Sequence, residues 1–219
     1  MPTPDQNDLS TWIDAELHDA RAMIDACRAD ADALRRLDAF ARHLAEVFRA
    51  GGKVLACGNG GSACDAMHFC EELTGRYRFN RPALPAIACA DASHITCAAN
   101  DFGYDAAFAR WVEALARPGD ALVVLSTSGN SRNILAAVEA AETRGVTTAA
   151  FLGQGGGALR GRCDYQWVVP APQAPDGSER KTFSDRIQEV HMLLLHVLVG
   201  AIERHRFGPD GAERDAESE

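Results

Sequence analysis

Residue types that could do chemistry gather in the run VLACGNGGSACDAMHFCEE, residues 54–72. The run predicts a short buried strand, a glycine-rich turn and then a helix. Glycines at such a turn let a ligand approach the backbone closely, and the free N–H groups at the start of the helix favour an anion. His68 and Glu72 are four residues apart and therefore share one helix face. They could bind a metal, act as an acid/base pair or form an ordinary surface pair.

A second candidate site is the loop STSGNS, residues 126–131, which follows the apolar segment ALVVLS. In open α/β sheets, ligands bind beyond the carboxyl ends of the strands. Hydroxyl groups, a glycine and a helix N-terminus could hold a phosphate there, although the same residue types also suit a plain N-cap turn. The lysine of a nucleotide-binding P-loop is missing, and glycines at 58, 60 and 61 do not match the dinucleotide fingerprint. The sequence therefore favours a phosphate-bearing ligand over a nucleoside triphosphate or nicotinamide cofactor.

A long helix predicted from Phe183 to about His205 carries further candidates. At about 100° per residue, Gln188 diverges by roughly 60° from His191 and by roughly 80° from His196. Helical spacing therefore leaves open which histidine joins Gln188. His196 lies within the apolar run LLLHVL, where a buried imidazole needs a partner and is more often a core residue than an active-site residue.

The elements that must position these residues alternate along the chain. Apolar stripes at helical spacing predict two N-terminal helices, over residues 13–24 and 34–48. Strands are predicted at 53–57, 84–90, 121–126, 147–152 and 165–169, and further helices at 62–73, 104–116 and 130–144. This order predicts an α/β fold: a doubly wound, mostly parallel sheet flanked by helices, with an N-terminal helical hairpin and a long C-terminal helix. We expect residues 1–206 to form a single domain and the acidic residues 207–219 to be a disordered tail.

Composition limits the possible partners. The 219 residues carry a formal net charge of −9, which argues against binding nucleic acid or an anionic membrane. The seven cysteines are an odd number without a C-x-x-C pair, as expected for reduced thiols in the cytosol. The N-terminus lacks a signal-peptide pattern, and the longest apolar run, residues 192–202, is too short to cross a bilayer. We expect a soluble cytoplasmic protein.

Four ordered segments, 57–77, 100–103, 126–131 and 185–196, together resemble the bacterial phosphoheptose isomerases, which are sugar-isomerase (SIS) domain proteins. The likeness extends over roughly residues 9–205. It implies isomerisation of D-sedoheptulose 7-phosphate to D-glycero-D-manno-heptose 7-phosphate, the first step of ADP-heptose biosynthesis for the lipopolysaccharide core. It also implies a homotetramer with active sites shared between subunits and one zinc ion per subunit.

The resemblance assigns residues by position. The implied zinc ligands are His68, Glu72, Gln188 and His196, so His196 is favoured over His191. The implied substrate contacts are Asn59, Gly60, Gly61, Glu72, Asn100, Asp101, Ser126, Thr127, Ser128, Ser131 and Gln188. Isomerisation through an enediol needs a base at carbon, an acid at oxygen and stabilisation of the oxyanion. We expect Glu72 to be the base and His196 the acid.

Two features depart from this family pattern. The segment Ala171–Lys181 is longer than the usual connection into the last helix, and the acidic tail is an addition. The main alternative is a non-catalytic SIS paralogue that binds the replication initiator protein. Such relatives lack the equivalents of Glu72 and His196, which this chain retains. The sequence therefore favours the enzyme.

Overall fold

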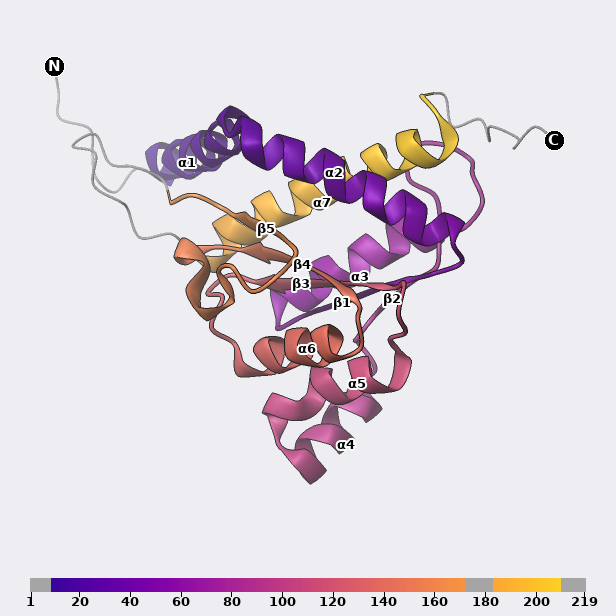
Figure 1. Ribbon diagram of the computed structural model, residues 1–219. Coiled ribbons are helices and arrows are strands. Elements are labelled where there is room, and N and C mark those ends of the chain that lie inside the picture. Colours follow the sequence, from indigo (N-terminus) through magenta and orange to yellow (C-terminus); the bar gives the residue numbers. More distant parts are fainter. Residues whose placement is uncertain (1–8, 172–182, 210–219) are drawn as a thin grey trace, which may run out of the picture.

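A five-stranded, fully parallel sheet forms the centre of the computed structural model, which describes residues 9–171 and 183–209 (Figure 1). The strand order is β2-β1-β3-β4-β5, which places the topological switch point between β1 and β3. The strands are β1 (Val54–Gly58), β2 (Ala86–Ala88), β3 (Ala121–Ser126), β4 (Thr147–Leu152) and β5 (Tyr165–Val168). β1 and β3 are buried along their whole length, as expected for central strands of a parallel sheet. The predicted doubly wound fold is confirmed.

Helices cover both faces of the sheet (Figure 1). One face packs against α2 (Ala31–Arg49), α3 (Gly61–Thr74) and α7 (Ser184–Phe207), and the other against α5 (Ala107–Leu115) and α6 (Arg132–Thr143). α4 (Ala92–Phe102) lies beyond α5, at the end of the molecule farthest from α2 (Figure 1). The face with α3 and α7 therefore brings together the two helices that carry the candidate histidines.

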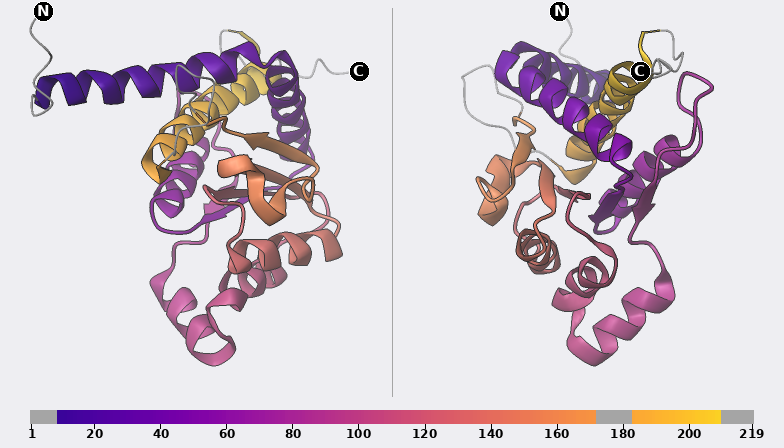
Figure 2. Two further views of the ribbon diagram at one scale, coloured as in Figure 1. Left: turned by 90° about the vertical axis from the view of Figure 1, so that its left-hand side faces the viewer. Right: turned by 45° about the vertical axis from the view of Figure 1, so that its right-hand side comes forward.

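The two predicted N-terminal helices are present. α1 (Leu9–Ala29) meets α2 at Asp30, whose carboxylate accepts a hydrogen bond from the Ala33 N–H and caps α2. The helices meet at a wide angle, and α1 extends beyond the body of the molecule (Figure 2). Large apolar side chains on α1, including Leu9, Trp12 and Leu17, are exposed.

Two local predictions were wrong. The sequence pattern predicts no helix between residues 91 and 103, yet α4 occupies this segment, and the Asp91 carboxylate accepts from the N–H groups of Ser93 and His94. Only Ala98 of α4 is buried, and its sequence, ASHITCAANDF, is mostly made of residues with modest helix propensity such as Ser, Thr, Asn and Asp. The strand predicted at 84–90 is reduced to β2, because this edge strand pairs only with β1.

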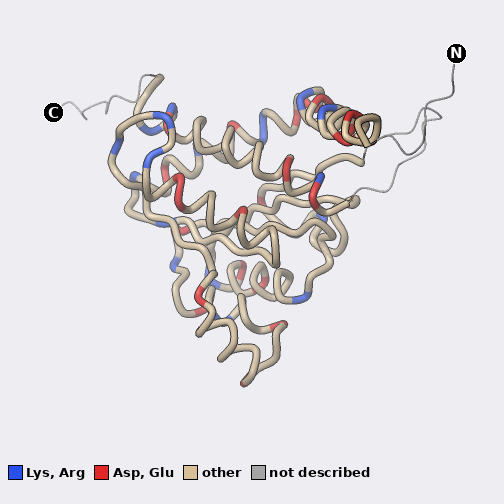
Figure 3. The backbone as a smooth tube through the Cα atoms, turned by 180° about the vertical axis from the view of Figure 1, so that it is seen from behind, with Lys and Arg blue, Asp and Glu red and all other residues tan. Residues whose placement is uncertain are grey.

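Basic and acidic residues are interspersed over the described chain rather than collected on one face (Figure 3). Several pair within a helix turn, such as Arg21 with Asp25 and Arg42 with Asp38. Within residues 9–171 and 183–209, no helix is both long and apolar enough to cross a membrane. Nearly all of the long connection predicted at 171–181, and residues 210–219 of the predicted tail, lie outside the described residues. The predicted start of the tail at residue 207 was wrong, because Phe207 is the buried last residue of α7.

Candidate active site

The two loops singled out in the sequence lie side by side. Strands β1 and β3 pair in register, with Gly58 opposite Leu125, so the turn after β1 and the serine loop after β3 leave the same edge of the sheet. This edge holds the carboxyl ends of the strands, at the topological switch point. The sheet therefore positions a glycine turn and a hydroxyl-rich loop at the place where α/β proteins bind ligands.

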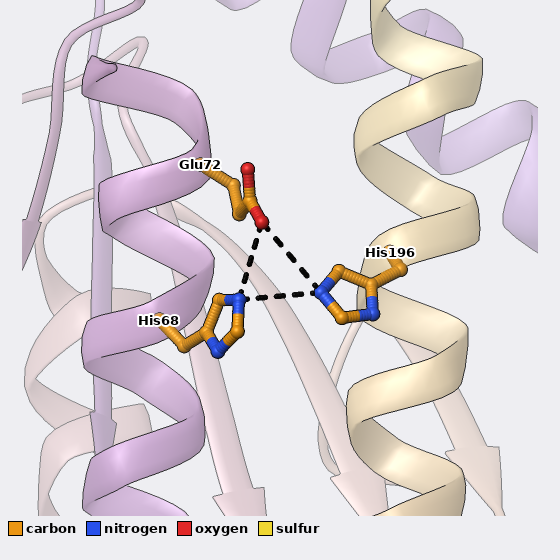
Figure 4. Close-up of side chains that lie close together, drawn as sticks. All are labelled: His68, Glu72 and His196. Atoms are coloured by element: carbon orange, nitrogen blue, oxygen red, sulfur yellow. Dashed lines mark hydrogen bonds and ion pairs between the residues drawn. The ribbon is translucent and has the colours of Figure 1, made fainter. Parts of the chain in front are cut away.

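His68, Glu72 and His196 form a cluster between α3 and α7 (Figure 4). His68 Nε2 lies 3.2 Å from Glu72 Oε1 and 3.3 Å from His196 Nε2. The third side of this triangle, from His196 Nε2 to Glu72 Oε1, is 3.7 Å. α3 supplies two of the atoms because its residues four apart share a face, and packing of α7 on α3 supplies the third.

The geometry of this cluster fits a metal ion. A tetrahedral zinc with bonds of about 2.0–2.2 Å separates its ligand atoms by roughly 3.3–3.6 Å. The three distances in the cluster, 3.2, 3.3 and 3.7 Å, match the edges of one face of such a tetrahedron. Two imidazole nitrogens and a carboxylate oxygen are also donor types that zinc prefers.

Aromatic packing orients the His196 ring. The Tyr77 ring stacks on it, with ring centroids 5.8 Å apart and an interplanar angle of 14°. The guanidinium of Arg78 lies over the Tyr77 ring. Partial burial lowers the pKa of His196, and the nearby His68 lowers it further, while Glu72 raises it. The net result is a histidine that releases its proton more readily than one in water.

The structure separates the two histidines that spacing left open. His191 is completely buried, and its Nε2 donates a hydrogen bond to the Leu152 carbonyl at 3.1 Å. Burial lowers the pKa of His191 to about 4, so it is neutral at pH 7. His191 is thus the core histidine of α7, and His196 is the one that faces α3.

Gln188 lies two turns before His196 on α7, beside the start of α3. Its Nε2 is 3.3 Å from Ser62 Oγ. A Cβ atom at Gly61 would come within 2.6 Å of the Gln188 side chain, so only glycine fits there without displacing it. In this arrangement Gln188 joins α7 to the glycine turn rather than to the His68 cluster.

Asn59, at the tip of the glycine turn, pairs with a residue that the sequence analysis missed. Its side-chain amide exchanges two hydrogen bonds, of 2.8 and 2.9 Å, with the buried amide of Asn133 on α6. The Tyr104 hydroxyl also donates to Asn59 Oδ1, at 2.8 Å. The only sequence signal for Asn133 was its place two residues after the serine loop.

The serine loop is held by its own hydroxyls and by a contact with the start of α7. Ser126 Oγ accepts from the Gly129 N–H at 3.1 Å, and Ser128 Oγ accepts from the Asn130 N–H at 3.2 Å. Ser131 occupies the N-cap of α6 without a side-chain capping bond, which leaves N–H groups of that helix start available. Thr127 Oγ1 lies 3.3 Å from Ser184 Oγ at the start of α7.

Asn100 and Asp101 stand apart from the other candidates. They lie at the end of α4, are exposed, and hydrogen-bond to each other at 2.8 Å. α4 belongs to the helices on the opposite face of the sheet from α3 and α7 (Figure 1). Within this chain they are therefore not brought to the His68 cluster.

Comparison with known proteins identifies the family. The SIS domain model matches residues 17–153. A phosphoheptose isomerase of Vibrio cholerae is 48% identical over 192 residues, which are 88% of this chain and 96% of that protein. One of Aeromonas salmonicida is 49% identical over 189 residues, covering 86% and 94% of the two chains.

Solved structures agree with these sequence relatives. A phosphoheptose isomerase from Francisella tularensis has a TM-score of 0.78 at 33% identity, covering 91% of this chain and 100% of the other. One from Neisseria gonorrhoeae has a TM-score of 0.75 at 36% identity, covering 89% and 98%. This chain therefore belongs to the phosphoheptose isomerases of the SIS domain family and is a sugar-phosphate isomerase.

Proposed function

We propose that the protein converts D-sedoheptulose 7-phosphate to D-glycero-D-manno-heptose 7-phosphate in the cytoplasm, as the first step of ADP-heptose biosynthesis for the lipopolysaccharide core. The observation that supports this most is the His68–Glu72–His196 cluster, placed between α3 and α7. The names of the relatives support the substrate class. Glu72 and His196 are the residues that a non-catalytic paralogue would lack, so their presence in one cluster speaks against that alternative.

One zinc ion per subunit is part of this proposal. His68, Glu72 and His196 would hold it, in keeping with the distances among their ligand atoms. Gln188 is proposed as the fourth ligand on the family resemblance alone, since its amide contacts Ser62 in the structure. When bound, zinc would polarise the sugar carbonyl and favour negative charge on its oxygen.

The substrate phosphate is proposed to bind at the serine loop. Hydroxyls and the free N–H groups at the start of α6 are suited to an anion there. The proposed phosphate contacts are Ser126, Thr127, Ser128 and Ser131. The sugar would extend along the glycine turn, in contact with Asn59, Gly60 and Gly61, and end between Glu72 and Gln188.

Proton transfer is assigned to two residues of the cluster. Glu72 would take the proton from the carbon next to the carbonyl, and His196 would give a proton to the oxygen. Burial lowers the pKa of His196, which favours its neutral form, the form that would bind a metal. A carboxylate that binds zinc is a weaker base, so the ligand and base roles of Glu72 are expected to alternate during turnover.

A homotetramer with active sites shared between subunits completes the proposal. Asn100 and Asp101 are proposed substrate contacts, yet they are exposed on α4 and away from the cluster of their own chain. A site completed by a second subunit would give these residues a function. The exposed apolar side chains of α1, including Leu9, Trp12 and Leu17, also suit burial against another subunit.

The experiment is an assay of the purified protein with sedoheptulose 7-phosphate, with and without a chelator, in which formation of the aldose is followed. We expect aldose formation that stops on chelation and returns when zinc is added back. Absence of the aldose with zinc-loaded protein would refute the proposed reaction. Undiminished turnover after verified metal removal would refute only the role of zinc.

A further inference from the structure

A buried ion pair lies next to the cluster, joining the chain after α3 to α7. Arg81 Nε is 3.1 Å from Glu203 Oε1, and both side chains are completely shielded from solvent. Glu203 Oε2 has no hydrogen-bond partner among the described residues, so Arg81 is the cation that offsets its charge. Neither residue belongs to a sequence motif that points to function.

The guanidinium of Arg81 also binds the end of α3. Arg81 Nη2 donates to the main-chain carbonyl of Glu72 at 2.7 Å, and Nη1 donates to the carbonyl of Leu73 at 2.8 Å. The last carbonyls of a helix lack partners within the helix, and a cation there is favoured by the helix dipole. Arg81 thus holds the turn of α3 that carries Glu72.

Glu203 anchors the same guanidinium to α7. It lies seven residues after His196, which corresponds to a divergence of about 20° on the helix, so both residues share the face that packs on α3. At the other end of the contact, Gln188 of α7 meets Ser62 of α3 at 3.3 Å. The cluster of His68, Glu72 and His196 therefore lies between two polar links that join the same two helices.

We propose that Arg81, paired with Glu203, is a positioning residue that fixes the last turn of α3 against α7 and so sets the separation between Glu72 and His196. A fully buried ion pair contributes little net stability compared with an apolar pair of the same size, but it requires one defined geometry. Three ligand atoms that converge on one metal ion need such a defined geometry. Groups that orient metal ligands typically change the affinity for the metal by about 10- to 100-fold. This inference rests on the metal site in the proposed function.

The test compares Arg81→Lys and Glu203→Gln with a matched control, Asp120→Asn. Asp120 is also a buried carboxylate of an ion pair, with Lys53, but it lies where β1 and β3 begin, at the opposite edge of the sheet from the site. Each protein is freed of metal and checked for folding by circular dichroism. Affinity for Co²⁺ is then measured by its visible absorption, with Zn²⁺ competition.

We expect Arg81→Lys and Glu203→Gln to bind Co²⁺ about 10- to 100-fold more weakly than the wild type, and Asp120→Asn to bind within about twofold of it. In the sugar-phosphate assay, kcat should fall for the first two while KM stays near its wild-type value, since the serine loop is untouched. Unchanged affinity in folded Arg81→Lys and Glu203→Gln would overturn the proposal, as would an equal loss in Asp120→Asn. Failure of both variants to fold would also overturn the proposal, because the pair would then be required for the fold itself. No Co²⁺ binding by the wild type would instead refute the metal site itself.

Discussion

His68 Nε2 and His196 Nε2 lie 3.3 Å apart although 128 positions separate the two residues in the chain. Two imidazoles in such contact repel each other when both are protonated, and they are stabilised by a shared proton or a shared cation. Their rings do not stack but meet edge to face, with centroids 5.0 Å apart. The two Nε2 atoms therefore face each other. This pair, completed by Glu72, underlies the first prediction.

Removing either proposed proton-transfer group should slow turnover strongly. Glu72→Gln and His196→Ala are expected to lower kcat by about 10²- to 10⁴-fold, the range typical for loss of a general acid or base. Glu71→Gln is the matched control, because Glu71 is exposed and points about 100° away from Glu72 on α3. The measurement is kcat on sedoheptulose 7-phosphate with protein shown to keep its assembly by gel filtration. Near-normal turnover in either active-site variant would contradict the assignment.

The serine loop should tolerate no side chain at Gly129. Gly129 has a φ of +64°, and a Cβ there would lie 1.9 Å from the Gly156 carbonyl oxygen. Gly155 has a similar φ of +77° but nothing within 4 Å of its Cβ position, so Gly155→Ala is the control for backbone strain alone. We expect Gly155→Ala to cost ~1–2 kcal/mol of unfolding free energy. Gly129→Ala should cost more and also raise KM, measured by urea unfolding and steady-state kinetics; equal effects of the two substitutions would contradict this.

His191 should make the protein sensitive to acid. Its pKa is about 4 in the folded protein, below the ordinary value of 6.5, so the folded state binds fewer protons than the unfolded state. The stability that His191 contributes is therefore present above pH 6.5 and is lost as the pH falls toward 4. A shift of this size corresponds to ~3 kcal/mol.

The variant His191→Gln isolates this effect, because an amide can still donate to the Leu152 carbonyl but does not titrate in this range. Urea unfolding at a series of pH values should show a smaller loss of unfolding free energy between pH 7 and pH 4 for the variant than for the wild type. Parallel curves for the two proteins would show that His191 does not contribute to acid sensitivity.

The amide pair between Asn59 and Asn133 should matter for substrate binding. Asn133→Leu keeps the side-chain size but removes both of its hydrogen bonds to Asn59, which is then oriented only by the hydrogen bond from Tyr104. We expect KM to rise about tenfold, corresponding to about 1.4 kcal/mol, with a smaller change in kcat. Thr143→Val, at the exposed far end of the same helix, removes a hydrogen bond to Glu139 and serves as the control. An unchanged KM in Asn133→Leu would show that this pair is structural only.

The local sequence alone determined the fold class and part of the candidate site. Alternation of apolar strands with helices predicted the parallel sheet, and the i, i+4 spacing placed His68 and Glu72 on one face of α3. Both features depend on short-range patterns, continuous apolar runs for the buried strands and a period of 3.6 residues for the helix, which a single segment contains in full. α4 was missed because its sequence, ASHITCAANDF, is poor in strong helix formers.

Only the tertiary structure decided which distant residues meet. Helical spacing left His191 and His196 equally eligible as the partner of Gln188, and only the family resemblance favoured His196. The packing of α7 on α3 and on the sheet decides between them, because it directs His191 to Leu152 and His196 to His68. The same packing paired Asn59 with Asn133, residues 74 positions apart, and Arg81 with Glu203, 122 apart. Such pairs leave no periodic trace in the sequence, because each forms only when two complete elements dock. The local sequence determines which side chains each helix carries. The packing of the helices determines which of these side chains meet.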